Sequence, residues 1–307
     1  MTRVTLGLAG AIGHDPSAAL FVDNRLVAAV EEERLVRRKH AKGELPYLAA
    51  RQCLRCAGLK ASDVTHVAIP YAPISLFSRA RWHYAYRHWY APERSLDALF
   101  NGNRRYRRYI RELKGLLEKL HIPFDEIELI PVRHLLAHAS SGYHMAEEEG
   151  KTAIFVVDSK SEYSNMFLGY GEGGRIHKIK QFNNPDSLSG MYAALTDYLG
   201  FEMLDGELKV MGIAPFGDPN KYDLSDLATF DGKHFRVNTK LITTVGLRRY
   251  KAKSRGHYFS RKLVEKLGPR RAGNLLEDPY VHYAAAIQKL YEDMAMGLVT
   301  HYLGSVL

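Results

Sequence analysis

The chain has 307 residues, enough for about two domains at roughly 150 residues each, and 46% of them are hydrophobic and 25% charged. No apolar run approaches the ~18 residues of a membrane span, and the N-terminus lacks the apolar core of a secretory signal, so we expect a cytoplasmic protein. The formal net charge of +9 favours an anionic partner, either a phosphate-bearing substrate or nucleic acid, and does not decide between them.

The first part of the chain predicts an α/β opening that starts with antiparallel strands. Short apolar runs separated by turn residues predict strands over residues 3–10, 17–23 and 26–33. An amphipathic helix follows over residues 46–58, and a further strand follows over residues 66–70.

The two cysteines of the chain, Cys53 and Cys56, stand inside this predicted helix with C-x-x-C spacing. A redox pair or half of a zinc knuckle has the same spacing, but no second cysteine pair accompanies it. Packing on one helix face is the favoured interpretation, and two cysteines exclude a disulfide framework.

The same order of strands returns in the second half of the chain. An apolar strand over residues 152–158 is followed by strands over residues 164–172 and 175–182. A duplicated three-stranded meander suggests the two lobes of an actin-like ATPase, whose first turns close around the phosphates of a nucleotide. We expect the lobes to cover residues 1–150 and 151–307, and two unrelated meanders are the alternative.

A basic and aromatic insert lies between the two copies, at about residues 79–120. Its second half predicts a helix whose apolar face carries Leu113, Leu116, Leu117 and Leu120. A helical subdomain with a solvated basic face explains this composition, and RNA binding also fits it. The third interpretation is a surface for an anionic or sugar-like acceptor, with rings available for stacking at Trp82, Tyr84, Tyr86, Trp89 and Tyr90.

The segment PVRHLLAHASSGYH predicts a metal site. His134 and His138 stand four residues apart, which on a helix places both imidazoles on one face, one turn apart. Asp158 follows the apolar strand at its carboxyl end, where open α/β sheets place functional groups. Two imidazoles and a carboxylate suit iron, zinc or manganese. Solvated or core histidines are the alternative.

A second set of polar residues follows the first two predicted strands. His14 lies in the first turn, where it could act as a general base with Asp15 holding its tautomer; a turn aspartate that caps its own backbone is the alternative. The stretch EEERLVRRKH could grip phosphates through Arg34, Lys39 or His40, or could be a solvated helix start.

A glycine-rich segment, GFEMLDGELKVMGIAPFGDP at residues 200–219, contains Glu207 and Lys209. Glycine allows a backbone to approach a ligand closely, so these two side chains are candidates for ligand binding. An ordinary loop is the alternative.

Together these segments resemble the O-carbamoyltransferases of the nodulation and antibiotic-tailoring type, which are related to the tRNA threonylcarbamoyl transferases. The resemblance covers almost the whole chain. It rests on the ordered motifs GHDPSAAL, AAVEEERLVRRKH, HLLAHASS, SGMYAALTDYLGF, GELKVMGIAPFGDP and HYAAAIQ.

The resemblance implies an actin-like fold and a carbamoyl transfer reaction. A companion domain would make carbamoyl-adenylate from carbamoyl phosphate and ATP, and the actin-like domain would move the carbamoyl group to a hydroxyl of a small acceptor. Matched by motif, His14 would be the base on that hydroxyl, and the three metal candidates would hold a divalent ion, iron before zinc or manganese. The remaining candidates would bind the nucleotide or substrate: Lys39, His40, Ser159, Lys160, Glu162, Glu207 and Lys209.

The chain departs from the family pattern in two ways that matter. The family's D-G-x-G-E loop reads D-S-K-S-E here, from Asp158 to Glu162, so that a Cβ stands where backbone approaches phosphate. The family also continues with a strand, a glycine-rich nucleotide loop, a fourth aspartate ligand and the adenylate-forming domain. We therefore expect the N-terminal part of an actin-like domain, with an incomplete second lobe and a completing C-terminal chain or domain. A degenerate, non-catalytic binding module and a tRNA threonylcarbamoyl-type transferase are the alternative functions.

Overall fold

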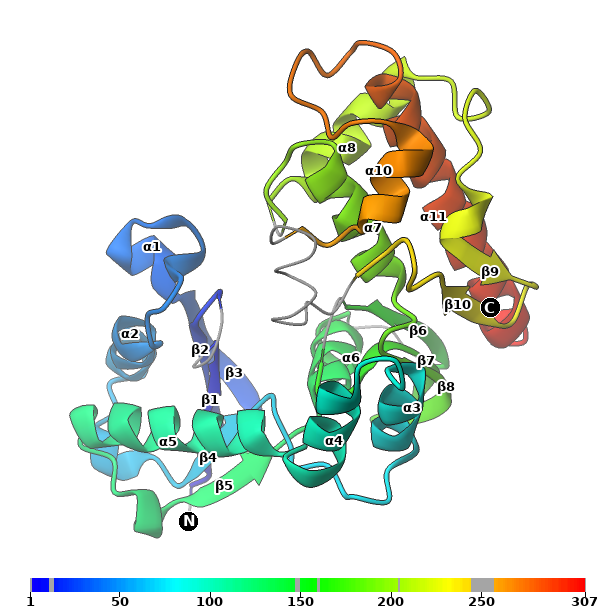
Figure 1. Cartoon of the computed structure of the whole chain (residues 1–307). Coiled ribbons are helices and arrows are strands. Elements are labelled where there is room, and N and C mark those ends of the chain that lie inside the picture. Colours follow the sequence, from blue (N-terminus) through cyan, green and yellow to red (C-terminus); the bar gives the residue numbers. More distant parts are fainter. Residues whose placement is uncertain are drawn as a thin grey trace. The chain divides into compact units, whose positions relative to one another are not determined.

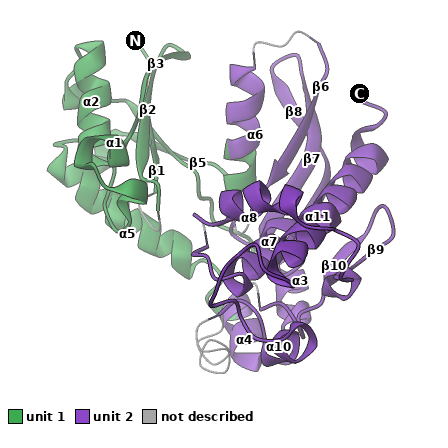
Figure 2. Ribbon diagram, turned by 90° about the horizontal axis from the view of Figure 1, so that it is seen from above, with its two compact units in different colours: residues 1–76, 100–137 green, residues 77–99, 138–307 purple. Residues whose placement is uncertain are grey.

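The computed structural model describes residues 2–10, 14–146, 150–158, 161–203, 205–243 and 257–306 (Figure 1). The chain forms two compact units (Figure 2). Unit 1 comprises Met1–Leu76 and Phe100–Ala137, and unit 2 comprises Phe77–Leu99 and His138–Leu307. These units differ from the expected lobes in residues 77–99 and 138–150, so the lobe boundary stays a prediction.

A five-stranded mixed sheet forms the centre of unit 1, in the order β3-β2-β1-β4-β5. The first three strands pair antiparallel, whereas β4 runs parallel to β1 and β5 parallel to β4. The strands are β1 (Val4–Ala9), β2 (Ser17–Val22), β3 (Arg25–Glu31), β4 (His66–Ile69) and β5 (Glu128–Pro131). The first four confirm the predicted strands, and β5 was not predicted.

Two helices cover one face of this sheet, α2 (Tyr47–Ala57) and α5 (Arg104–Lys119). The side chains of Val4, Leu6 and Leu8 alternate onto that face and are buried there, as a period of two requires. The predicted apolar face of α5 is confirmed, because its three leucines and Leu120, which caps the helix, are all buried. On α2, Cys53 is buried and Cys56 is exposed, so packing accounts for the first cysteine alone.

Unit 2 contains the second meander, β6 (Thr152–Val157), β7 (Ser164–Glu172) and β8 (Arg175–Asn183), paired antiparallel in that order. The predicted repeat is therefore confirmed: each half of the chain contains a three-stranded antiparallel meander that begins with an apolar strand. The α/β class is confirmed, and this repeat is the pattern from which the actin-like fold was expected. A small hairpin of β9 (Ala228–Phe230) and β10 (Phe235–Val237) is separate.

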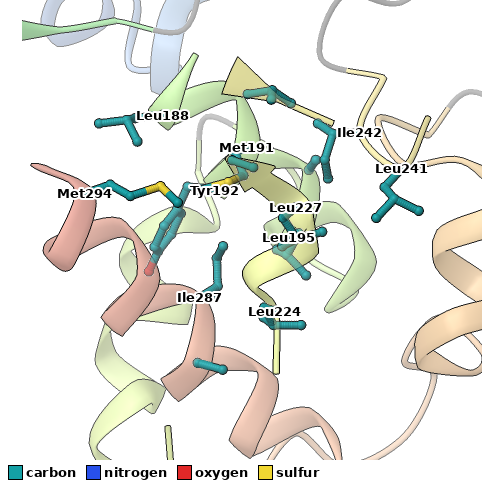
Figure 3. Close-up of a cluster of buried hydrophobic side chains, with 14 of the residues drawn as sticks. Leu188, Met191, Tyr192, Leu195, Leu224, Leu227, Leu241, Ile242, Ile287 and Met294 are labelled. Atoms are coloured by element: carbon teal, nitrogen blue, oxygen red, sulfur yellow. The ribbon is translucent and has the colours of Figure 1, made fainter. Parts of the chain in front are cut away.

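The core of unit 2 lies between α7 (Leu188–Tyr198) and α11 (Tyr280–Leu303). In Figure 3, Leu188, Met191 and Leu195 of α7 and Ile287 and Met294 of α11 belong to one buried cluster. Because α7 is buried on nearly every side, the apolar positions of its sequence show little helical periodicity. Among the described residues, no helix is long and apolar enough to cross a membrane.

The remaining helices are short. The helices of the insert that precede α5 are α3 (Arg79–Arg87) and α4 (Pro92–Phe100). The others are α1 (Glu32–Val36), α6 (His134–Met145), α8 (Glu207–Ile213) and α10 (Arg261–Leu267). Single 3₁₀ turns are η1 (Lys39–Ala41), η2 (Ala61–Asp63), η3 (Phe124–Glu126), η4 (Ala214–Phe216) and η5 (Ser225–Leu227).

The basic insert is helical throughout, but its helices belong to different units. Helix α5 packs in unit 1, where the Tyr109 hydroxyl donates a 2.8 Å hydrogen bond to the Leu8 carbonyl. Helix α3 packs in unit 2 against β8. The insert is therefore divided between the two units rather than forming a subdomain of its own.

Candidate catalytic and metal-binding residues

The metal candidates lie on helix α6 and directly after strand β6. His134 and His138 lie one turn apart on α6, and Asp158 follows the last residue of β6. His138 and Asp158, both in unit 2, each place a donor atom within 4.8 Å of the other. His134 belongs to unit 1, so one site with two imidazole donors and one carboxylate donor stays a prediction.

The ring of His134 is held from two sides within unit 1. Its Nδ1 lies 3.2 Å from the Pro70 carbonyl oxygen, and the ring stacks on Tyr71 at 5.1 Å between centroids. A carbonyl oxygen only accepts, so Nδ1 carries the proton and Nε2 is the basic nitrogen of the neutral ring. Histidine ligands of metals are commonly oriented by such a bond from the other ring nitrogen. The donor set and this support fit a divalent transition metal.

A second cluster, all in unit 1, is centred on Asp15. His14 Nδ1 lies 2.5 Å from Asp15 Oδ2, and His40 Nδ1 lies 2.9 Å from Asp15 Oδ1. Burial acts to raise the pKa of Asp15, but the hydrogen bonds from His14 and His40 outweigh it and hold that pKa below its ordinary value. The structure therefore joins two residues that the sequence placed in different motifs. Glu33, which the sequence analysis did not single out, contacts the backbone of His40.

Glu32, the second glutamate of EEERLVRRKH, has a structural role. Glu32 is buried, and its two carboxylate oxygens accept hydrogen bonds of 3.0 and 2.7 Å from the backbone N–H groups of Leu48 and Ala49. It satisfies donors at the start of α2, as a capping carboxylate does. The interpretation of this stretch as a solvated helix start is wrong at Glu32. A buried acid in a charged run leaves no periodic signal in the sequence.

The other predicted binding residues are more dispersed. Lys39 is exposed in η1, and Glu162 is half-buried in the turn between β6 and β7. Glu207 begins α8, and the ammonium of Lys209 lies 5.8 Å from the ring centroid of Phe201. Ser159 and Lys160 lie outside the described residues. The roles of all six stay predictions.

A buried ion pair fixes the aromatic helix α3 in unit 2. Arg87 donates a 2.7 Å hydrogen bond to Asp186, and His83 Nε2 lies 3.1 Å from the same carboxylate. The backbone N–H of Val237 donates a third bond at 3.0 Å. Burial acts to raise the pKa of Asp186, but the bonds from His83 and Arg87 hold that pKa below its ordinary value. These residues anchor α3 rather than serving a ligand.

The aromatic residues of the insert divide into two groups. Trp82, Tyr86 and Trp89 are exposed by 51%, 69% and 75%. Trp82 and Tyr86 lie four residues apart on one face of α3, and Trp89 follows the end of that helix. Tyr84 instead stacks on His88 at 4.1 Å between ring centroids. The first three are therefore available for stacking on an acceptor, and that role stays a prediction.

The chain matches one protein family over nearly its whole length and is similar to two curated proteins and to a solved structure. The family model described as carbamoyltransferase N-terminus matches residues 4–303. Nodulation protein NolNO of Sinorhizobium fredii is 31% identical over 302 residues, 97% of this chain and 40% of its own length. Uncharacterized protein sll1178 of Synechocystis is 31% identical over 73% of this chain and 36% of its own length. YeaZ from Pseudomonas aeruginosa is similar in structure with a TM-score of 0.32 and 16% identity, over 60% of this chain and 70% of its own.

Proposed function

Because the chain belongs to the carbamoyltransferase N-terminus family, we propose that it transfers a carbamoyl group from carbamoyl-adenylate to a hydroxyl of a small acceptor. Carbamoyl phosphate and ATP would supply the adenylate. The chain spans about two-fifths of the length of its curated relatives, so we further propose that an adenylate-forming segment acts with it as a C-terminal partner. The proposed site of the reaction is the cytoplasm.

The observation that carries this proposal is the Asp15 cluster. With its Nδ1 against Asp15, His14 has Nε2 as the basic nitrogen. His14 Nε2 takes the proton of the acceptor hydroxyl while the hydroxyl oxygen bonds to the carbamoyl carbon. The bond from that carbon to the adenylate oxygen then breaks, and AMP leaves with the electron pair. The Asp15 carboxylate stabilises the imidazolium that forms.

The metal proposal concerns His134, His138 and Asp158. A divalent ion held by these side chains, Fe²⁺ by preference over Zn²⁺ or Mn²⁺, would supply Lewis acidity toward the carbamoyl oxygen or the phosphate. Three protein donors leave coordination positions for a substrate, as in catalytic rather than structural sites.

Metal analysis of the purified chain tests the donor set. In an anaerobic Fe²⁺ titration we expect weak binding of iron by the wild-type chain alone, and a loss of affinity of more than about 100-fold in His134→Ala, because a missing ligand costs more than a missing orienting partner. His144→Ala, at an exposed position on the same helix, is the matched control and should keep its iron. Unchanged iron in His134→Ala would contradict the assignment.

The transfer itself is tested with ¹⁴C-carbamoyl phosphate and ATP. The remaining portion of a longer relative is supplied in trans, and a panel of polyhydroxylated small molecules serves as acceptors. Labelled acceptor should form only when the chain is present, and His14→Asn should lower the rate about 10²–10⁴-fold. Formation of labelled threonylcarbamoyl-tRNA or of no product in any combination would favour the alternative functions.

A further inference from the structure

The Asp15 cluster contains more than the pair that the proposed reaction uses. Asp15 has two carboxylate oxygens, and each takes a different histidine: His14 at Oδ2 and His40 at Oδ1. The two rings are 6.5 Å apart between centroids and nearly perpendicular. Because both oxygens are engaged, the carboxylate cannot rotate without breaking one bond. The orientation of His14 therefore depends on His40.

His40 is held through hydrogen bonds of its backbone as well as through its ring. Its N–H donates a 2.7 Å hydrogen bond to Glu33 Oε2, and its carbonyl accepts a 3.0 Å bond from the N–H of Asp15. The φ angles of Asp15 and His40 are 54° and 59°, in the left-handed region that non-glycine residues rarely occupy. Such backbone persists where surrounding contacts over-determine it, and it is concentrated at functional sites.

Glu33 is placed to hold the backbone of His40. Its side chain is 18% exposed, and Arg34 lies 3.5 Å from its other oxygen, Oε1. The carboxylate is therefore partly shielded from water and held on one side by a cation, while Oε2 receives the His40 amide. Among the described residues, the charged and titratable groups in contact with this cluster include His14, Asp15, Glu33, Arg34 and His40.

We infer that His40 and Glu33 are positioning residues for the base, Glu33 holding the His40 backbone and His40 holding the Asp15 carboxylate that orients His14. This inference rests on the proposed function, because it assigns the cluster to the same transfer. During transfer the proton taken by His14 Nε2 makes the ring an imidazolium, and the fixed carboxylate faces the Nδ1–H of that ring. His40 gains and loses no proton in the step.

The same side chains suggest a competing use. Asp15, Glu33 and His40 each place one donor atom within 4.8 Å of the other two, which would allow them to hold a cation. The hydrogen bonds favour the positioning role, because Glu33 Oε2 already receives an amide and His40 Nδ1 already faces Asp15. A coordinated ion would have to displace both bonds.

The test compares His40→Leu with His40→Asn in the full chain. Leucine removes the bond to Asp15, whereas the asparagine amide nitrogen can replace the Nδ1 donor. With the transfer assay described above, we expect His40→Leu to lower kcat about 10–100-fold with KM for carbamoyl phosphate unchanged, as partners that orient an imidazole do. His40→Asn should restore most of the rate. Glu33→Ala should act in the same direction and more weakly.

Imidazole ¹⁵N NMR provides a readout that needs no transfer activity. In the wild type, His14 should be the Nδ1–H tautomer, and in His40→Leu it should become a mixture of both tautomers. An unchanged His14 tautomer or full kcat in a folded His40→Leu variant would overturn the inference. Loss of bound Fe²⁺ or Mn²⁺ in His40→Leu would overturn it in favour of a cation site. If no acceptor is ever labelled but the tautomer changes, the proposed function fails and the positioning network stands.

Discussion

Asp15 in unit 1 and Asp186 in unit 2 are both carboxylates that bind histidine and have a lowered pKa, yet their surroundings differ. The Asp186 side chain is 7% exposed and binds Arg87 and a backbone N–H, whereas the Asp15 side chain is 48% exposed and binds a second histidine. Burial with an arginine makes the first pair an anchor. Exposure, a second histidine in place of an arginine, and left-handed backbone leave the second pair able to exchange protons with a ligand. An aspartate–histidine pair is therefore not assigned a role by its residue types. Its burial and the other groups that bind the carboxylate decide whether it stabilises the fold or serves a ligand.

Removing the arginine of the buried pair should have the largest effect on stability. Arg87→Ala leaves Asp186 charged and buried, which costs about 3–5 kcal/mol of unfolding free energy. Urea unfolding followed by circular dichroism measures this loss. Arg261→Ala, which breaks an exposed pair with Glu265, is the control and should cost less than about 1 kcal/mol.

The stability of the protein at low pH should also show the contribution of Asp186. The folded-state pKa of Asp186 lies below the ordinary value of 3.8, so its contribution is complete above that value and is lost as pH falls through the folded pKa. We expect Asp186→Asn to lower stability near neutral pH and to flatten the fall in stability below about pH 4. Urea unfolding between about pH 2.5 and pH 7 measures both slopes, and parallel curves for variant and wild type would rule out this contribution.

The histidine of the anchor should matter less than the arginine. His83 is partly exposed and gives Asp186 a single bond of 3.1 Å, so His83→Ala should cost about 1 kcal/mol in urea unfolding. A loss as large as that of Arg87→Ala would mean that the histidine, and not the arginine, carries the anchor.

The smallest stability effect is expected at Asp15. Asp15→Asn keeps a side chain that tolerates left-handed backbone and changes exposed bonds only, so unfolding free energy should change by less than about 1 kcal/mol. The same variant should nevertheless impair transfer, because the amide can hold His14 in the wrong tautomer. A stability loss comparable with that of Arg87→Ala would mean that Asp15, like Asp186, mainly stabilises the fold, and the two carboxylates would then not differ in role.

The sequence predicted the features that depend on local spacing. Strand alternation located both meanders, and the four-residue spacing of His134 and His138 predicted one helix face. The approach of His40 to Asp15 was not predictable, because 25 residues separate them and left-handed φ angles at Arg37 and His40 close the loop. The partners Asp186 and His83 are 103 residues apart, and neither lies in a pattern that indicates a pair.

The unequal cysteines of helix α2 give the protein a natural labelling position. Cys53 is buried, and burial raises the pKa of its thiol to about 11, so it reacts slowly with electrophiles. Cys56 is exposed one turn further along the same helix. A maleimide dye or spin label added to the native protein should therefore attach once, at Cys56 in unit 1, without any engineered cysteine. Its signal would report movements of that unit when nucleotide or acceptor is added.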